Sequence, residues 1–276
     1  MNHKVLAEDL DRLVARAAFS LREDVKRLIV KAYRVETNKK AKRALGWILD
    51  NAKIAQKEKL AICQDTGLPI IFIEAGRDIK LNTCLVDAIK KGVENGYRNN
   101  HLRPSLTDPL KRGSSCKGAI SYLEFSKAKG LRITLFPKGF GSENKSQLKM
   151  FNPTASIDQI EDFVVRVVKE AGPESCPPFV VGVGIGGTSD KSLALAKKAL
   201  IGRIDKPNSD KVLNSLEKRL VKRINFLKIG PMGFGGGATC LAVKVQKALT
   251  HIAGLPVGVN ISCHALRSAT IKVNIT

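Results

Sequence analysis

The sequence predicts a mixed α/β fold in which layers of β-sheet are flanked by helices. Two observations support this prediction. Helical stripes of apolar residues alternate with short apolar runs typical of buried strands, and no repeat or low-complexity linker interrupts the pattern. The 276 residues, 43% of them hydrophobic, suffice to bury a sizeable core. We therefore expect residues 1–276 to form a single domain, or two coupled lobes of one domain.

The individual elements follow from periodicity. Apolar residues at helical spacing predict helices over residues 4–21, 38–58, 83–97, 157–171, 189–200 and 210–227. Ser189 or Asp190 is the expected N-cap of the fifth of these helices. Compact apolar runs predict strands over residues 70–73, 120–125, 131–136, 179–187, 240–245 and 255–262. A turn with Gly130 separates the second and third runs, which predicts that these two strands pair with each other.

The net charge of +22 points to nucleic acid, an acidic partner chain or an anionic substrate. The lysines and arginines are spread along the chain, and only 5% of the residues are aromatic, which favours a lysine-rich solvated surface over nucleic-acid binding. The chain has no apolar run of about 18 residues, and its first residues lack the pattern of a signal peptide. We therefore predict a cytoplasmic protein that binds neither membrane nor nucleic acid.

Six cysteines are scattered along the chain, and none forms a CxxC pair. Without a secretion signal, this distribution argues against a disulfide framework. Cys84 and Cys240 fall within a predicted helix and a predicted strand, so we expect both to be core thiols. A metal site would have to be assembled from distant segments.

Glycines suggest a second kind of site. Gly182, Gly184 and Gly187 match the dinucleotide-binding pattern GxGxxG, and Asp205 follows at about the expected 20 residues. Asp205, however, lies in a polar turn between two predicted helices instead of at the end of a second strand, which weakens this NAD-dependent alternative. The glycine-rich loops predict either tight turns or backbone packed around a small charged ligand, and they span residues 139–142, 182–187 and 233–237.

A set of longer motifs resembles the class I fumarases. In the family's order the chain shows CQDTG at 63–67, PKGFGSENKS at 137–146, CPPFVVGVGIGGTSDKSLALAKKAL at 176–200, IGPMGFGGGAT at 229–239 and PVGVNISCHALR at 256–267. The resemblance covers most of the chain from residue 61 onward, while the first 60 residues match only as generic helices. After residues 108–110 the family shows an Asn/Thr-rich turn. Here the chain reads KRGSSCKGA, which leaves the choice of diacid open and Cys116 without a role.

The resemblance implies the N-terminal, cluster-binding domain type of that family and a 4Fe-4S cluster bound by Cys63, Cys176 and Cys263. Thiolates are the usual ligands of such clusters. Three protein ligands for four irons leave one iron open as a Lewis acid for the substrate.

The resemblance also implies substrate-binding residues. Gln64 and Asp65 are expected to contact the substrate, with Asp65 as a candidate acid or base. The residues alone also allow an Asx-turn at Asp65, and the two interpretations are compatible. Arg103 is expected to bind a substrate carboxylate, and Gly141 to lie in the substrate-binding loop.

Two histidines lie near the third cysteine. His251 matches a family histidine that reaches the substrate of a neighbouring subunit, and it is a candidate catalytic residue. His264 is expected only to pack beside the cluster ligand that precedes it.

These implications define the expected function. The main hypothesis is a hydro-lyase subunit that hydrates fumarate to malate, and the alternative is the α subunit of an L-tartrate dehydratase. The less favoured hypotheses are an NAD-dependent enzyme and a basic nucleic-acid-binding protein. Single-chain relatives carry a further C-terminal domain with more cationic contacts and the expected base. Because the sequence ends at Thr276, we expect a separate β subunit, an α2β2 assembly and a dicarboxylate substrate.

Overall fold

The computed structural model describes residues 3–80, 82–103, 105–115 and 118–273. The chain divides into two compact units. Unit 1 comprises Met1–Arg22, Asn51–Phe140 and Arg267–Thr276, and unit 2 comprises Glu23–Asp50 and Gly141–Leu266. Two segments of unit 2 thus interrupt the sequence of unit 1.

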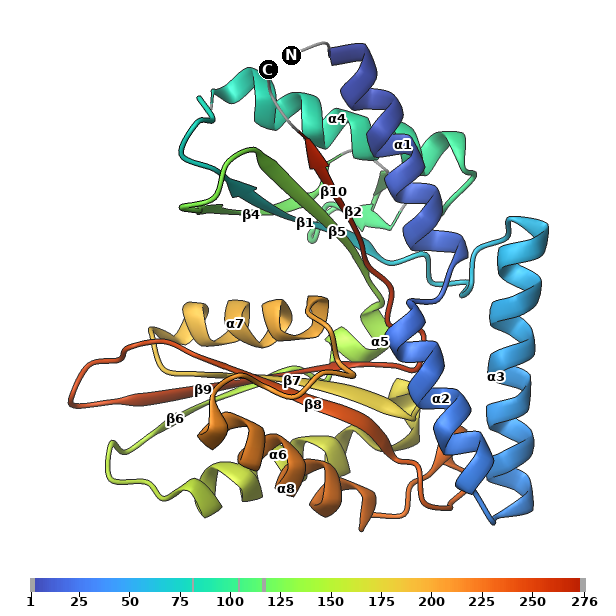
Figure 1. The fold of residues 1–276 in the computed structure, drawn as a ribbon, viewed down its shortest axis with the longest axis vertical. Helices are drawn as coiled ribbons and strands as arrows, with labels where there is room; N and C mark the ends of the chain where they lie inside the picture. The colour runs from blue at the N-terminus through green and yellow to red at the C-terminus, as the bar shows by residue number, and fades with distance from the viewer. Residues whose placement is uncertain (1–2, 81, 104, 116–117, 274–276) are drawn as a thin grey trace. The chain divides into compact units, whose positions relative to one another are not determined.

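Unit 1 is built on a four-stranded mixed sheet with the order β10-β5-β1-β4. These strands are β10 (Ala269–Val273), β5 (Leu131–Lys138), β1 (Leu68–Ala75) and β4 (Ile120–Phe125). Helices α1 (His3–Phe19) and α4 (Thr83–Asn99) cover one face of this sheet (Figure 1). The core between helices and sheet buries Leu10, Val14, Ile89, Val93, Ile71, Ile73, Ile133 and Leu135. A short pair, β2 (Leu106–Thr107) and β3 (Ser114–Ser115), lies outside this sheet.

The predicted pairing of residues 120–125 with residues 131–136 is wrong. β1 lies between β4 and β5, pairing parallel with β4 and antiparallel with β5. β1 is buried along almost its whole length, whereas β4 is partly exposed along its length. The more apolar strand therefore takes the inner position, where both of its edges are hydrogen-bonded, and β4 becomes an edge.

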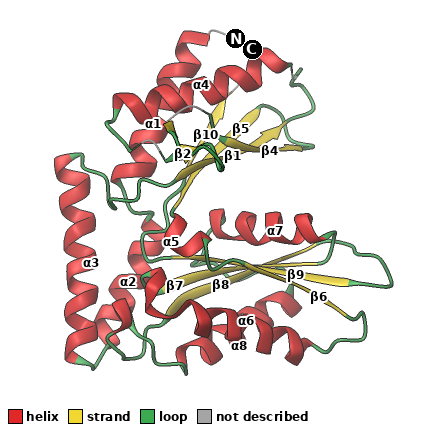
Figure 2. Ribbon diagram, turned by 180° about the vertical axis from the view of Figure 1, so that it is seen from behind, coloured by secondary structure: helices red, strands yellow, loops and turns green. Residues whose placement is uncertain are grey.

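Unit 2 contains the second four-stranded mixed sheet, with the order β6-β9-β7-β8. The strands are β6 (Gln147–Phe151), β9 (Leu255–Ser262), β7 (Phe179–Ile185) and β8 (Cys240–Lys247). Helix α7 (Ser189–Ile201) covers one face, and α6 (Ile157–Ala171) and α8 (Lys211–Asn225) cover the other (Figure 2). The prediction of sheet layers flanked by helices is confirmed at this level.

The remaining helices are short or lie outside the sheet layers. Helix α2 (Glu23–Val35) belongs to unit 2, and the boundary between the units falls within α3 (Lys39–Glu58), after Asp50. Helix α5 (Phe140–Glu143) begins at another boundary, after Phe140, and the two remaining boundaries follow Arg22 and Leu266. Two 3-10 turns cover Gly172–Ser175 and Pro231–Gly233.

The sequence prediction missed α2, β6 and β10, together with the two-residue strands β2 and β3, the short helix α5 and the two 3-10 turns. Strands β6 and β10 are edge strands that each leave most of their side chains at least partly exposed, so neither presents a compact apolar run. The N-cap prediction for α7 is also wrong by one residue. The cap is Thr188, whose backbone is extended, and the helix begins at Ser189. Asp190 lies in the first turn, where a hydrogen bond from the Thr188 side chain lowers the pKa of its carboxyl.

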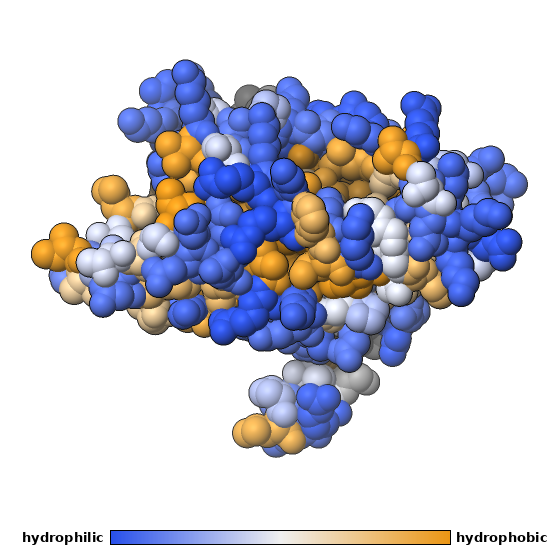
Figure 3. Space-filling view, turned by 90° about the horizontal axis from the view of Figure 1, so that it is seen from below, coloured by the Kyte–Doolittle hydropathy of each residue, from blue (hydrophilic) through white to orange (hydrophobic). Residues whose placement is uncertain are grey.

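In the space-filling view hydrophilic side chains dominate the visible face, with apolar areas between them (Figure 3). Among the described residues, no helix is long and apolar enough to cross a membrane.

Candidate functional site

The first group of predicted site residues lies in unit 1, in the turn that precedes β1. We call residues 63–67 the CQDTG turn. Oδ1 of Asp65 accepts a hydrogen bond from the Gly67 N–H at 2.9 Å, and Oδ2 accepts one from the Phe140 N–H at 2.7 Å. The Asx-turn prediction at Asp65 is confirmed. Gly67 has φ of +86°, and a Cβ there would lie 2.6 Å from the main-chain carbon of Pro137, so the turn requires glycine.

Three further hydrogen bonds hold this turn. The Tyr97 hydroxyl donates to the Gly67 carbonyl at 3.2 Å, and the Thr66 hydroxyl donates to the Arg103 carbonyl at 3.2 Å. Nη2 of Arg267 donates to the Asp65 carbonyl at 2.8 Å. Burial raises the pKa of Tyr97, against the opposing effect of the Arg267 charge, so the hydroxyl remains a neutral donor.

The turn brings four predicted residues together. The half-buried Cys63 thiol donates to Oε1 of Gln64 at 3.3 Å, and Nη1 of Arg103 donates to the Gln64 carbonyl at 3.4 Å. The Gln64 and Arg103 side chains are exposed, whereas Asp65 is half-buried. Two polar side chains that solvent can reach thus flank a carboxylate of fixed orientation.

The other two predicted cluster ligands lie in unit 2. Cys176 follows the turn Gly172–Ser175 and adopts the left-handed conformation, with φ of +53°, and Cys263 directly follows β9. His264 donates its main-chain N–H to the Cys176 carbonyl at 3.2 Å, and its ring Nδ1 lies 3.0 Å from the same oxygen. The backbone after Cys263 is therefore attached to that of Cys176, and both thiols are half-buried.

The motif GSENKS forms a polar network in the same unit. Glu143 accepts from Nδ2 of the buried Asn260 at 2.7 Å and pairs with Lys197 at 2.5 Å. The Ser146 hydroxyl lies 2.7 Å from the same Asn260 nitrogen. The network joins three of the fumarase-like motifs, since Lys197 lies in the third and Asn260 in the fifth.

The remaining cysteines differ from these three. Cys240 is buried as predicted, and burial raises the pKa of its thiol to about 12, so it is a poor metal ligand. The prediction for Cys84 is wrong: it is exposed in the first turn of α4, because the buried stripe of that helix begins one residue later. Cys116 lies outside the described residues.

The donor set fits a cluster by its chemistry. Cys63, Cys176 and Cys263 each combine a thiol with partial exposure, which lets a metal reach the sulfur. Within the described part of either unit, no three Cys, His, Asp or Glu side chains are grouped in a way that could hold a metal. Cys63 lies in unit 1, and Cys176 and Cys263 lie in unit 2.

Gly141 and His251 are not among the residues that form the hydrogen bonds described above. Gly141 is exposed in α5, where a Cβ would find only the Glu174 carbonyl, at 4.0 Å. His251 is exposed in the connection between β8 and β9, and its Nδ1 accepts from the Ala253 N–H at 3.1 Å.

The glycine-rich loops are largely explained by the chain itself. In loop 139–142 the Phe140 N–H binds the Asp65 carboxylate, and in loop 233–237 the Gly237 N–H donates to Glu36 at 2.8 Å. Gly182 and Gly184 lie directly against the backbone of α7, where a Cβ would collide with it. The anion expected at the first and third loops is a carboxylate of this chain, and the second loop is a close strand–helix contact.

Asp205, the acid of the dinucleotide pattern, has an ordinary surface role. It lies between α7 and α8, as predicted, and pairs with Arg203 at 2.8 Å and with Arg27 at 2.5 Å. A hydrogen bond from Arg203 lowers the pKa of its carboxyl to about 2. These contacts account for Asp205 without a ribose.

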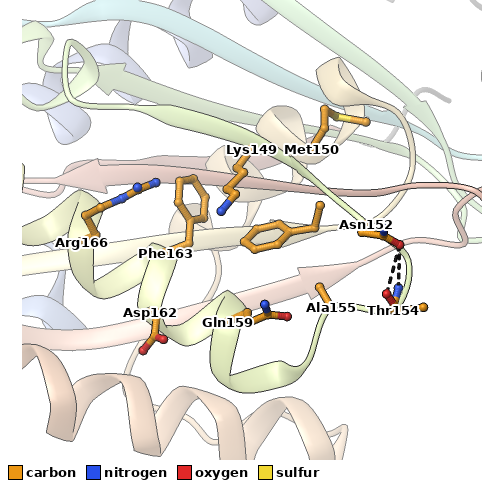
Figure 4. Close-up of a pocket in the computed structure, with 10 residues that line it drawn as sticks. Lys149, Met150, Asn152, Thr154, Ala155, Gln159, Asp162, Phe163 and Arg166 are labelled. Carbon is orange, nitrogen blue, oxygen red and sulfur yellow. Dashed lines mark hydrogen bonds between the residues drawn. The ribbon is translucent and has the colours of Figure 1, made fainter.

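A pocket of about 420 Å³ lies between β6 and α6 in unit 2 (Figure 4). Phe151 and Phe163 meet edge to face, with 5.7 Å between ring centroids. Lys149 lies over the first ring and Arg166 over the second. The pocket contains none of the predicted site residues, so we do not assign it to the reaction.

The motifs, the fold and the paired cysteine segments agree with the comparison to known families. The family model described as fumarate hydratase (Fumerase) matches residues 7–272. The chain therefore belongs to the fumarate hydratase family. It is a hydro-lyase of the type of class I fumarases and tartrate dehydratase α subunits.

Three individual relatives show to which proteins of this family the chain is similar. The chain is 40% identical to the putative L(+)-tartrate dehydratase subunit alpha of Methanocaldococcus jannaschii, over 95% of both chains. It is 30% identical to a putative class I fumarate hydratase of Geobacillus stearothermophilus, over 98% of this chain but only 55% of that protein. It is 24% identical to the L(+)-tartrate dehydratase subunit alpha of Escherichia coli K12, over 98% of this chain and 91% of the relative.

Proposed function

We propose that this chain is the α subunit of a 4Fe-4S-dependent hydro-lyase that acts on a hydroxy-dicarboxylate, with L-tartrate as the favoured substrate. The observation that carries the proposal is the 40% identity to a putative tartrate dehydratase α subunit over 95% of both chains. This replaces fumarate as the first choice.

Fumarate hydration remains the second candidate. Its support is the 30% identity to the putative class I fumarate hydratase and the resemblance of GSENKS and the α7 segment to the fumarases. The segment 111–119, which departs from the fumarase motif, is the part of the chain where a different diacid preference is expected.

Cys63, Cys176 and Cys263 would hold the cluster. When bound, the cluster supplies a Lewis acid that polarises the hydroxyl group lost as water. The residues' own contribution is positional: the His264–Cys176 contacts join the two cysteine segments of unit 2, and the CQDTG turn fixes Cys63 beside Asp65.

Asp65 is the proposed proton-transferring group of this chain. Both of its carboxylate oxygens accept a backbone N–H, which sets the plane of the carboxylate. Each oxygen keeps a further lone pair, so proton exchange with a bound diacid stays open. The exposed Arg103 and Gln64 would orient the carboxylates, since a guanidinium matches a carboxylate in two hydrogen bonds. Gly141 and His251 are kept as proposed substrate-contacting residues.

A separate β subunit is proposed as the partner. The support is that the tartrate dehydratase relatives, which this chain matches along nearly their full length, are named as alpha subunits. The fumarate hydratase relative is nearly twice as long as the matched region. An acidic β subunit would also offset the repulsion within a chain of net charge +22, and an α2β2 assembly is the proposed form.

The decisive experiment is anaerobic reconstitution of the chain, alone and with its β subunit, followed by assay of L-tartrate, malate and fumarate. We expect dehydration only from the pair, with the highest kcat/KM for L-tartrate. Higher kcat/KM for malate and fumarate would favour the second candidate. Full activity of the chain alone would contradict the subunit proposal, and no activity on any of the three diacids would contradict the function.

A further inference from the structure

Arg267 is a buried arginine in unit 1, at the start of the segment that leads into β10. Only 2% of the residue is exposed. Its Nη2 donates to the Asp65 carbonyl, but Nε and Nη1 have no hydrogen-bond partner among the described residues. Buried donors without partners cost free energy, and folded proteins keep few of them. This placement calls for a reason beyond packing.

The contact that Arg267 makes is with the main chain of the proposed proton-transferring residue. The Asp65 carboxylate is fixed by the N–H groups of Gly67 and Phe140, and Arg267 fixes the carbonyl of the same residue. Both the side chain and the main chain of Asp65 are therefore restrained. A guanidinium suits this task because it is planar and keeps its charge at any physiological pH.

Arg267 acts through this turn and not on the substrate. Nε and Nη1 are closed to solvent, so a diacid cannot reach them. Arg103, by contrast, is exposed and contacts the same turn through the Gln64 carbonyl. The two arginines thus have different proposed roles, binding for Arg103 and positioning for Arg267.

We propose that Arg267 is a positioning residue that holds the CQDTG turn in place, and so fixes the Cys63 thiol and the Asp65 carboxylate relative to each other. The proposal that Arg267 holds the turn follows from its hydrogen bond to the Asp65 carbonyl and does not depend on the reaction. Its meaning for the reaction rests on the proposed function.

Arg16 supplies a matched control. Its Nη2 donates to the main-chain carbonyl of Thr270 at 2.5 Å, three residues beyond Arg267 on the same segment. Arg16→Ala therefore removes the same kind of hydrogen bond without touching the turn. Arg267→Ala removes the hold, and Arg267→Lys keeps the charge but loses the planar group.

The first test uses the chain without cluster or partner. Amide hydrogen exchange over residues 63–67 and alkylation of the Cys63 thiol are both followed by mass spectrometry. We expect Arg267→Ala to accelerate both by about tenfold and Arg267→Lys by less, because a charge-assisted hydrogen bond that closes the turn is lost. Arg16→Ala should leave both rates unchanged. The alkylation rate of Cys176 should be the same in every variant and the wild type. Wild-type rates in Arg267→Ala would overturn the proposal.

A variant that fails to fold does not end the test. The wild-type chain alone then supplies the measurement. Its Gly67 amide should exchange as slowly as the amides of β1, and fast exchange of the Gly67 amide would overturn the proposed hold on the turn.

The second test uses the reconstituted enzyme. We expect Arg267→Lys to lower kcat by about 10- to 100-fold with KM nearly unchanged, since misplacement of a reacting group by about 1 Å costs roughly that much. A raised KM with unchanged kcat would show a substrate-binding role and overturn the positioning role. If the wild-type pair binds no cluster and dehydrates no diacid, the proposed function fails, while the exchange rates still decide whether Arg267 holds the turn.

Discussion

Asp65 and Glu36 use the same device in different parts of the molecule. Each carboxylate accepts backbone N–H groups from its own neighbourhood and from a distant glycine-rich loop. Glu36 is only 6% exposed and accepts from Thr37, Asn38 and Gly237. Asp65 is half-buried, accepts from Gly67 and Phe140, and lies two residues from a partly exposed thiol.

The difference shows what a glycine-rich loop does and does not indicate. Backbone N–H groups in such a loop bind an anion, but the anion can be a side chain of the same protein. Only the surroundings of the bound carboxylate distinguish a structural role from a functional one. Glu36 is closed off and serves the fold, whereas Asp65 stays accessible beside Cys63, Gln64 and Arg103.

The largest expected effect comes from replacing the three proposed cluster ligands, one of which, Cys63, lies beside Asp65. Cys63→Ser, Cys176→Ser and Cys263→Ser should each abolish retention of the cluster, seen as loss of its visible absorbance in anaerobically reconstituted protein. Cys240→Ala is the control, because that thiol is buried and its pKa is raised. Loss of the cluster in Cys240→Ala, together with retention in Cys176→Ser, would refute the ligand assignment.

Asp65→Asn should retain the cluster and lose about 10²–10⁴-fold in kcat, the usual contribution of general acid–base catalysis. Asparagine still accepts one backbone N–H, and water reaches this half-buried position, so the loss of stability should be small. Steady-state kinetics and a denaturation curve on the same preparation separate the two effects. A near wild-type rate would reduce Asp65 to a turn-forming residue like Glu36.

Glu36→Gln should show the opposite pattern. The amide group of glutamine would face an N–H donor where the carboxylate accepted one, so we expect a loss of about 1–3 kcal/mol in the free energy of unfolding. The kcat of the folded enzyme should be unchanged. Denaturant titration measures the first quantity, and a large fall in kcat without a fall in stability would place a function at Glu36.

Asp205→Asn gives the smallest expected effect and serves as a reference for a half-buried carboxylate with exposed ion-pair partners. Its partners Arg203 and Arg27 are more than half exposed, so the loss of stability should stay below about 1 kcal/mol. Because the pKa is lowered to about 2 from 3.8, the contribution is present above pH 3.8 and disappears as the pH falls towards 2. Stability of variant and wild type should therefore converge in acid, and a difference that persists at pH 2 would contradict the ion-pair explanation.

The sequence predicted most of the strands and helices that bury an apolar face, but it missed helix α2, which buries Val25 and Ile29. It failed where tertiary context decides. The turn at Gly130 suggested a hairpin, but only the three-dimensional structure shows β1 between the two strands. Edge strands β6 and β10 carry too little apolar pattern to be recognised.

For the site, the motifs pointed to the residues of the CQDTG turn, whereas Tyr97 is only the last residue of the helix predicted over residues 83–97. Arg267 stood in a recognised motif without any signal of its partner, since its contact with Asp65 spans 202 residues of sequence. Hydrogen bonds between distant segments leave no local pattern, so the supports of the turn could be found only in the structure.

The order of unit 1 along the chain has a consequence during synthesis. The sheet of unit 1 is completed by β10, after all of unit 2 has been made. At the usual speed of translation, about 5–20 residues per second, the CQDTG turn waits roughly 10–40 s for Arg267 to emerge. Unit 1 and its half-buried Cys63 thiol therefore remain incomplete until the last part of the sequence is made, and unit 2 also lacks its inner strand β9 until just before Arg267.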